Sequence, residues 1–216
     1  MRIGIVGGTG DIGEGMALRF APFFDVIVGS REKEKAEASC GCSIDMLKKR
    51  GTECSLIGVS NQTAVDDADM VILAIPFKHL SGTLETLQGF ENKIVVSPVN
   101  PMEKRDFFEF VPPPEGSAAL MVQRMLPKSA RICTAFNTIA ANKWRALDES
   151  LTYSVPVCGD DTAAKRQVME VVNRISNLQA FDAGPLAVSS LVESLTPLLL
   201  NIARYNRLKD VGIQFR

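Results

Sequence analysis

The sequence predicts an α/β fold, with a doubly wound and mostly parallel sheet and a small C-terminal helical part. Short runs rich in valine and isoleucine recur along the chain without polar alternation, which is typical of parallel strands that are covered on both faces. Segments with a helical period of apolar residues lie between these runs. The alternation indicates right-handed strand–helix–strand units, and hence an open sheet between two layers of helices.

The expected elements follow in chain order. We expect strands at residues 3–6, 26–28, 56–59, 70–75, 94–96, 132–136 and 155–158. The first expected helix, 13–24, has apolar residues at helical spacing, and the second, 32–50, stops at Gly51, a residue suited to a C-cap. We therefore expect one domain over residues 1–158 and a helical part over residues 159–216, packed with it as one compact unit.

The charge balance argues against partners that require a strongly basic protein. The 216 residues include 24 Lys and Arg against 25 Asp and Glu, so the net charge is −1. Such a chain has no excess of positive charge for nucleic acid or an anionic membrane. The longest apolar run near the C-terminus, 198–202, is far shorter than the roughly 20 residues of a membrane span. We expect no nucleic acid and no membrane as partners.

Cysteine and histidine usage limits the chemistry further. The cysteines number five, and the chain begins MRIGIVGG, which does not resemble a secretory signal; we expect free thiols in the cytoplasm. His79 is the single histidine, which excludes a His-rich metal site. Cys40, Cys42 and Cys54 lack the spacing and the fourth ligand of a zinc site, so we expect no metal.

One long segment, 98–115, reads as a loop. It contains Phe107, Phe108 and Phe110, followed by three adjacent prolines at 112–114. Adjacent prolines do not fit a helix or a central strand. The segment is either a surface connection, which we favour, or a flap beside the functional site, since long loops in compact domains are often functional.

The first strand runs directly into the sequence GGTGDIG. Read from Gly8, this is G-x-G-x-x-G, with Gly8, Gly10 and Gly13 between a strand and an amphipathic helix, the setting of a Rossmann-type dinucleotide site. The first glycine allows a tight turn, the second lets the backbone touch a pyrophosphate, and the third lets the helix pack on the strand. Helix N–H groups then face the anion. Asp11 adds a carboxylate there, which either interacts favourably with the dipole at the N-terminus of the helix or points to solvent.

The end of the second strand predicts NADP rather than NAD. An NAD site usually carries Asp or Glu at this point for the ribose hydroxyls. Here the strand ends in Ser30 and Arg31, with Lys35 one helical turn further on. A hydroxyl and two cations suit a 2′-phosphate. The alternative is an ordinary charged surface, because acidic residues are interspersed with these cations.

Other polar residues follow the later strands, where ligands of such folds bind. His79 lies beyond the fourth strand and Asn137 beyond the sixth; Asn137 could donate to a carboxamide or a ring carbonyl, and both could equally be ordinary loop residues. A long C-terminal helix reaching to about Arg207 has an apolar stripe that we expect to be buried or to form a subunit interface, and a polar stripe that needs partners. The apolar stripe is Leu191, Leu195, Leu198 and Ile202, and the polar one is Ser190, Glu193, Ser194 and Asn201.

These motifs together resemble one family. The segments GGTGDIG, GSREKEKAE, LAIPFKH, VVSPVNP, TAFNTIAANKW, VPVCGDD and DAGPL…LVESLTPLLLNIARYN resemble, in this order, the NADP oxidoreductases that use the deazaflavin coenzyme F420. The resemblance implies a Rossmann domain with a small C-terminal helical part. It also implies reversible hydride transfer between reduced F420 and NADP, in archaeal cytoplasm, by a homodimer or a larger homo-oligomer joined through the C-terminal helix.

The resemblance also implies roles for individual residues. It places Thr9, Gly10, Asp11 and Ile12 on the pyrophosphate and Ser30, Arg31 and Lys35 on the 2′-phosphate. Around the nicotinamide half it places Ile75, His79, Asn100, Ala141 and Val211, to which our reading of the strand ends adds Asn137. Asp11 stands where asparagine is common, and Asn137 where relatives can have histidine. Because both cofactors carry their own redox chemistry, we expect no catalytic side chain.

Three other interpretations remain. Tyr205 and Lys209 match the Y-x-x-x-K pair of short-chain dehydrogenases, but that pair belongs in the middle of a chain, so we regard the match as coincidence. A flavin or ferric reductase of the same Rossmann type would reduce a different acceptor with NADPH. A non-catalytic NADP sensor would bind NADPH without turnover.

Overall fold

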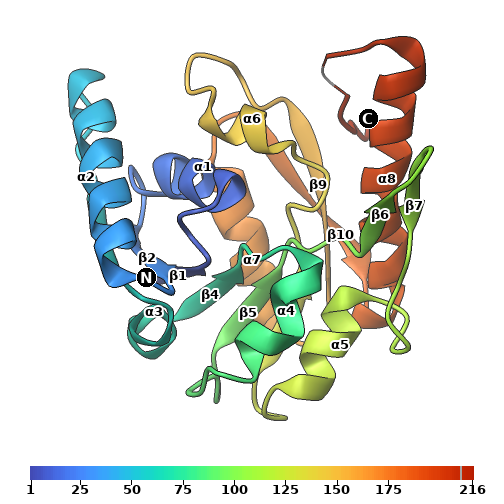
Figure 1. Cartoon of the computed structure of the whole chain (residues 1–216), viewed down its shortest axis with the longest axis horizontal. Coiled ribbons are helices and arrows are strands. Elements are labelled where there is room, and N and C mark those ends of the chain that lie inside the picture. The colour runs from blue at the N-terminus through green and yellow to red at the C-terminus, as the bar shows by residue number, and fades with distance from the viewer. Residues whose placement is uncertain (210) are drawn as a thin grey trace.

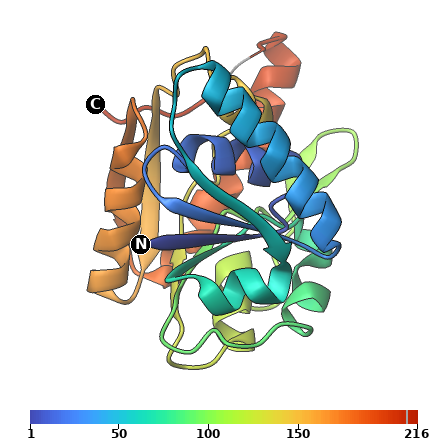
Figure 2. The same cartoon turned by 90° about the vertical axis from the view of Figure 1, so that its left-hand side faces the viewer.

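The computed structural model describes residues 1–209 and 211–216. They form an eight-stranded sheet in the order β10-β9-β8-β5-β4-β1-β2-β3, in which β8 and β9 pair antiparallel and the other neighbours are parallel (Figures 1 and 2). The predicted α/β class with a mostly parallel sheet is confirmed. The strands are β1 (Arg2–Val6), β2 (Asp25–Ser30), β3 (Ser55–Ser60), β4 (Met70–Leu73), β5 (Ile94–Ser97), β8 (Arg131–Thr134), β9 (Tyr153–Gly159) and β10 (Leu178–Gly184).

Helices cover both faces of this sheet. On one face, buried residues of α1 (Asp11–Phe20), α2 (Lys33–Lys49), α6 (Ala141–Arg145) and α7 (Thr162–Arg174) form one apolar core with the strands. On the other face, α3 (Asn61–Asp67), α4 (Phe77–Leu84) and α5 (Ala118–Met125) form a second core (Figure 2). The carboxyl ends of β1, β2, β4 and β5 therefore lie at one edge between two packed layers.

The predicted helices differ from the observed ones mainly at their ends. The first begins at Asp11 rather than residue 13 and ends at Phe20, where a turn that contains Pro22 follows it. The second ends as predicted, with Gly51 in the left-handed region at φ 70°, where a glycine costs least. The C-terminal part 159–216 also contributes a strand, β10, which pairs with β9 and which the sequence pattern did not predict.

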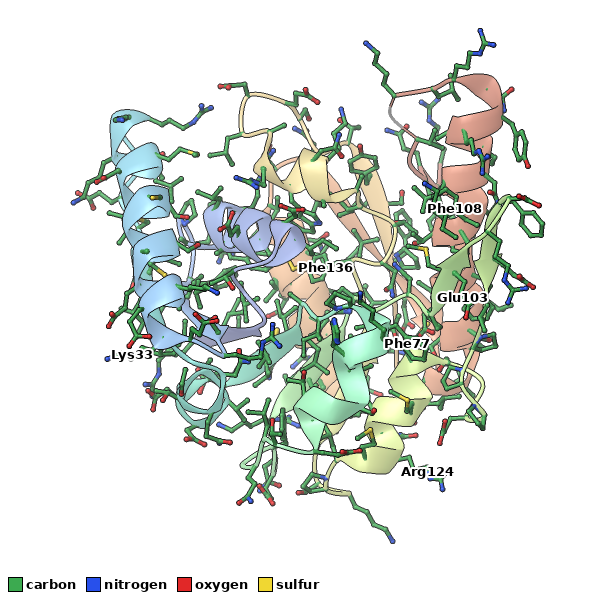
Figure 3. The ribbon with its side chains drawn as sticks, viewed as in Figure 1. Lys33, Phe77, Glu103, Phe108, Arg124 and Phe136 are labelled. Carbon is green, nitrogen blue, oxygen red and sulfur yellow. The ribbon has the colours of Figure 1, made fainter. Side chains whose placement is uncertain are left out.

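The predicted loop 98–115 contains a short antiparallel hairpin. Its strands are β6 (Met102–Lys104) and β7 (Phe108–Phe110), and the three prolines lie outside regular structure, as expected. The Asn201 side chain, on α8 (Ser189–Asn206), accepts from Phe108 N at 2.8 Å and donates to Phe108 O at 2.7 Å. The hairpin is thus anchored along α8 (Figures 1 and 3).

The polar side of the C-terminal helix, and not its apolar stripe, is buried in the structure. Leu191 is 68% exposed and Leu198 54%, whereas Glu193 is fully buried. The buried carboxylate accepts hydrogen bonds from Ala118 N and Ala119 N, at 2.8 and 3.0 Å. Because these two N–H groups at the start of α5 need an acceptor, the polar side of α8 faces the domain. The apolar stripe is exposed at Leu191, Leu198 and Ile202, so of the two alternatives burial in this chain is wrong, and the subunit interface stays a prediction.

The same helix is part of a long apolar segment. Together with the 3₁₀ turn before it, α8 makes a helical segment, Leu186–Asn206, of 21 residues with a mean hydropathy of 1.5. By length and composition such a segment could cross a membrane, although helices packed on a protein core pass the same test. The prediction that the apolar stretch near the C-terminus is far too short for a membrane span is therefore wrong.

Candidate cofactor-binding site

The glycine-rich turn after β1 is built by close backbone contacts. Gly7 lies in the left-handed region at φ 73°, so Gly7 rather than the predicted Gly8 makes the tight turn. A Cβ at Gly8 would lie 2.8 Å from Val28 Cγ1, and one at Gly13 only 2.5 Å from Gly8 Cα. Gly8 and Gly13 thus allow helix α1 to approach the turn, which confirms the role predicted for the third glycine.

Gly10 differs from the other glycines of the motif. A Cβ there would meet, among the described residues, only the Gly7 carbonyl oxygen, at 3.5 Å. The protein itself does not need a glycine at this point, and the space in front of it is open. Gly10 is also the N-cap of α1 and makes no side-chain cap, so the first N–H groups of the helix remain available to an anion.

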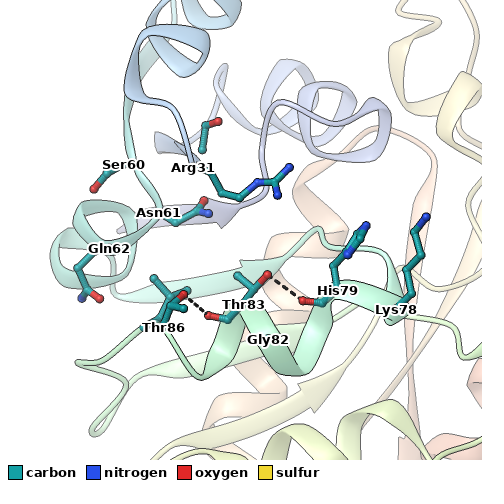
Figure 4. A pocket seen from close by; sticks show the side chains of 11 residues that line it. Arg31, Ser60, Asn61, Gln62, Lys78, His79, Gly82, Thr83 and Thr86 are labelled. Carbon is teal, nitrogen blue, oxygen red and sulfur yellow. Dashed lines mark hydrogen bonds between the residues drawn. The ribbon is translucent and has the colours of Figure 1, made fainter.

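A polar cavity of about 290 Å³ lies in front of this turn. It brings together seven of the predicted residues: Thr9, Gly10, Ser30, Arg31, Lys35, Ile75 and His79. The rest of its lining is Gly7, Glu32, Asn61, Ala74, Pro76 and Thr83. An outer cavity of about 490 Å³ adjoins it, sharing Ser30, Arg31, Asn61, His79 and Thr83 and reaching Lys78 on α4 (Figure 4). Segments after β1, β2, β3 and β4 therefore meet around one space.

The two cationic side chains of the polar cavity differ in whether they form an ion pair. Lys35 Nζ pairs with Glu32 Oε1 at 2.7 Å, with both side chains more than half exposed. Arg31, in contrast, has no ion-pair partner among residues 1–209 and 211–216. Ser30 is buried and its hydroxyl accepts from Glu32 N at 3.2 Å. The guanidinium of Arg31 is the cation that a phosphate would meet first.

Asn61 is a lining residue that the sequence reading missed. It begins α3, directly after β3, and it is only 8% exposed. Its Oδ1 accepts from Gly7 N at 3.0 Å. The signal that could have found it is its place after the third strand run, at the same sheet edge as Ser30.

A second, inner cavity of about 110 Å³ lies between the segment after β8 and α8. Its lining is Asn137, Thr138, Ile139, Ala140, Thr196, Leu199, Leu200, Ala203, Lys209 and Val211. Asn137 Nδ2 donates to Val99 O and to Asn100 Oδ1, both at 3.2 Å. Asn100 Nδ2 and Thr196 Oγ1 both donate to Asn137 O, at 2.9 and 2.7 Å. The predicted residues Asn100 and Asn137 thus hold each other, and Thr196 links them to α8.

Phe136, just before Asn137, has an unusual backbone. Its φ is 68°, a region that bulky side chains seldom adopt and that is associated with functional sites. The ring packs against Phe20 and Trp144, with centroid distances of 5.8 and 5.6 Å, and lies in the interior of the molecule (Figure 3). The packing of this aromatic cluster stabilises the left-handed conformation of Phe136, which orients the backbone of the next residue, Asn137.

Comparison with known proteins supports the reading of these cavities. Residues 2–101 match the family described as "NADP oxidoreductase coenzyme F420-dependent". The F420-dependent NADP reductase of Methanocaldococcus jannaschii is 38% identical over 99% of this chain and 97% of its own length. The chain belongs to the F420-dependent NADP oxidoreductase family. The resemblance inferred from the motifs is confirmed.

One further relative by sequence and one solved structure agree with this family. The F420-dependent NADP reductase of Methanothermobacter thermautotrophicus is 30% identical over 99% of this chain and 94% of that protein. The solved structure of a proposed F420-dependent NADP reductase from Arthrobacter sp. FB24 aligns with a TM-score of 0.80 at 20% identity, covering 100% of this chain and 99% of the other. The structural likeness supports the same fold over the whole length, including β10 and α8.

The cofactors of an F420-dependent NADP oxidoreductase fit the donor set present. The open space at Gly10 would admit a pyrophosphate backbone contact, and the unpaired Arg31 with Ser30 suits a 2′-phosphate. In the inner cavity, Asn137 Oδ1 and Thr138 Oγ1 are buried without a hydrogen-bond partner among the described residues. Buried polar atoms of this kind call for a partner, and a polar ring edge would supply one.

Several predicted residues line neither cavity. Ile12 and Asp11 are exposed, and Asp11 Oδ1 lies 3.2 Å from Arg145 Nη1. Arg145 also lies 3.5 Å from Glu14, so the carboxylate that we expected near the phosphates is paired at the surface. Ala141 begins α6 without reaching either cavity.

Burial shifts the pKa of groups outside the cavities. Desolvation raises the pKa of Glu193 to about 7, against the opposing effect of its bonds from Ala119 N and Ala118 N. Desolvation also raises the pKa of Cys133 to about 12 and that of Cys158 to about 11, so these thiols stay protonated. Within the described residues no group of three or more His, Cys, Asp or Glu is placed to hold a metal.

Proposed function

We propose that this protein transfers a hydride reversibly between reduced coenzyme F420 and NADP. The observation that carries the proposal is the pair of cavities at one sheet edge. The polar cavity offers an open glycine turn and a free guanidinium, and the inner cavity offers buried polar atoms without partners. Family membership supports the same pair of ligands, since the relatives are named F420-dependent NADP reductases.

The residues of this chain bind and orient, and they perform no covalent chemistry. Bound NADP and F420 supply the hydride acceptor and donor themselves. The turn at Gly7 to Gly10 and the N-terminus of α1 hold the pyrophosphate, while Ser30, Arg31 and Lys35 hold the 2′-phosphate. The ends of β4, β5 and β8 then carry Ile75, Asn100 and Asn137 to the nicotinamide half. Proximity and the exclusion of water are the contributions expected of such a site.

The size of the inner cavity limits how a ring can sit in it. Its volume of about 110 Å³ is below the roughly 300–1,000 Å³ of typical small-molecule sites. The cavity is therefore too small for a whole tricyclic ring, and the proposal is that it takes one polar edge of the ring while the remainder lies outside it. In this proposal the ring edge lies against Asn137 and Thr138, which line the cavity.

An absorbance assay with purified protein tests the reaction. NADPH is mixed with oxidised F420, and parallel samples contain a flavin or ferric citrate. We expect reduction of F420 and little reduction of the controls. Reduction of flavin or iron without F420 turnover would favour a reductase of the same fold, and tight NADPH binding without turnover of any acceptor would favour a sensor.

The proposal includes a homo-oligomer in the cytoplasm, joined through α8. The outward face of α8 exposes Leu191, Leu198 and Ile202, and the anchored hairpin adds Met102 and Phe107, which are 37% and 45% exposed. Exposed large apolar side chains on neighbouring elements support a subunit interface at this place. Light scattering should find a dimer or larger species for the native protein and a smaller one for Leu198→Asp.

A further inference from the structure

The orientation of the Asn61 amide is determined by its hydrogen bond to the glycine turn. Gly7 N is a donor, so the atom that faces it at 3.0 Å must be the carbonyl oxygen Oδ1. The amide nitrogen Nδ2 consequently faces the other way. Within the described part of the chain Nδ2 has no hydrogen-bond partner, although the residue is only 8% exposed.

The surroundings of Asn61 show where Nδ2 can donate. The side chain lies against β2, since a Cβ on Gly29 would be 2.8 Å from Asn61 Oδ1. Ser30 and Ser60, the neighbours of Gly29 and Asn61 in sequence, are partners in the β2–β3 register. Asn61 lines both the polar cavity and the outer cavity, and Figure 4 shows it on the same side as Arg31, across from His79 and Thr83.

We propose that Asn61 is a further specificity-determining residue for NADP, with Oδ1 holding the Gly7 N–H and Nδ2 donating to the 2′-phosphate beside Ser30 and Arg31. The inference rests on the proposed NADP site and deepens it. A neutral amide suits this place because it presents a donor to the phosphate and an acceptor to the glycine turn at once. Asn61 therefore ties recognition of the 2′-phosphate to the conformation of the turn that holds the pyrophosphate.

The substitution Asn61→Asp separates the two roles. Aspartate has nearly the same shape and keeps an oxygen for Gly7 N, but it replaces Nδ2 by an oxygen that carries negative charge and repels a phosphate. Losing one hydrogen bond to a charged group corresponds to roughly a 10- to 100-fold loss of affinity. We expect the Kd for NADPH and for 2′,5′-ADP to rise by about that factor, and the Kd for NADH to change little.

Two control variants complete the experiment. Gln88→Glu adds the same charge at an exposed position outside the lining of both cavities, and it should leave all three Kd values unchanged. Asn61→Ala removes both Oδ1 and Nδ2, so it should weaken NADPH and NADH together through the loss of the Gly7 anchor. Binding is measured by fluorescence titration, with thermal denaturation as the check that each variant is folded.

The outcomes distinguish this inference from the proposed function. If wild-type protein binds NADPH no more tightly than NADH, the assignment of the 2′-phosphate site itself is wrong. If the wild type prefers NADPH and Asn61→Asp keeps that preference, the role of Asn61 is wrong and the site stands. Equal weakening of NADPH and NADH by Asn61→Asp would also overturn it, because the amide would then serve a group common to both.

Discussion

The two cavities of this protein are built on different principles. The polar cavity is lined by exposed side chains such as Arg31, Lys35 and His79, and the one ion pair among them, from Lys35 to Glu32, lies at the surface. The inner cavity is lined by Asn137 and Thr196, whose polar atoms bond mainly to each other and to the backbone. The first kind of lining determines which ligand binds. The second determines how rigidly a ligand is held, and changes in it should also alter the stability of the fold.

The largest effect should come from reversing the charge at Arg31. Arg31→Asp removes two charge-assisted hydrogen bonds of roughly 1.5–3 kcal/mol each and introduces repulsion, so the ratio of kcat/KM for NADP over NAD should fall by about 10²- to 10⁴-fold. The exposed side chain has no ion-pair partner among the described residues, so the melting temperature should not change. An unchanged ratio would mean that the polar cavity does not select the 2′-phosphate.

Two glycine substitutions sharpen the distinction between binding and folding. A Cβ at Gly13 would meet the backbone of Gly8 at 2.5 Å, so Gly13→Ala should lower the free energy of unfolding by about 2–3 kcal/mol. At Gly10 the protein has room for a Cβ, with 3.5 Å to Gly7 O, so Gly10→Ala should fold normally and lose NADP affinity. Chemical denaturation and NADPH titration of both variants check this, and equal effects on both measurements would contradict it.

The sequence predicted the polar cavity well because its signals are local. The glycine turn is continuous in the chain, and Ser30, Arg31 and Lys35 follow a strand directly, so strand order alone brings them to one edge. Seven of the predicted residues do line this cavity. Asn61 escaped prediction because its importance depends on contact with Gly7, which lies 54 residues earlier.

The inner cavity and α8 were harder to predict because their partners are distant. The buried Glu193 accepts from N–H groups of α5, about 75 residues earlier, and the half-buried Asn201 bonds to the hairpin strand β7, 93 residues earlier. The leucine pattern alone does not distinguish a stripe that packs on its own domain from one that is exposed for a partner subunit. The buried carboxylate with its two donors decides which side of α8 faces the domain. Phe136 likewise gives no sequence signal for its left-handed backbone.

The buried carboxylate of α8 should make stability depend on pH. The pKa of Glu193 is raised from 4.5 to about 7 by desolvation, so between these values the folded protein binds more protons than the unfolded chain. The free energy of unfolding should therefore fall as pH rises from about 4.5 to about 7, by about 3 kcal/mol. Glu193→Gln should flatten this dependence in denaturation curves recorded across that range. A slope that persists in the variant would assign it to another group.

The smallest effect should come from His79, which is one of the residues that line both the polar and the outer cavity. Its side chain is exposed on α4, and one hydrogen bond to a ligand corresponds to about a 2- to 10-fold change. His79→Ala should therefore raise KM for NADP by no more than this factor and leave single-turnover hydride transfer nearly intact. If stopped-flow measurements instead showed that hydride transfer is abolished, His79 would take part in the chemistry itself. The separation between a cavity that selects a ligand and cofactors that react unaided would then no longer hold.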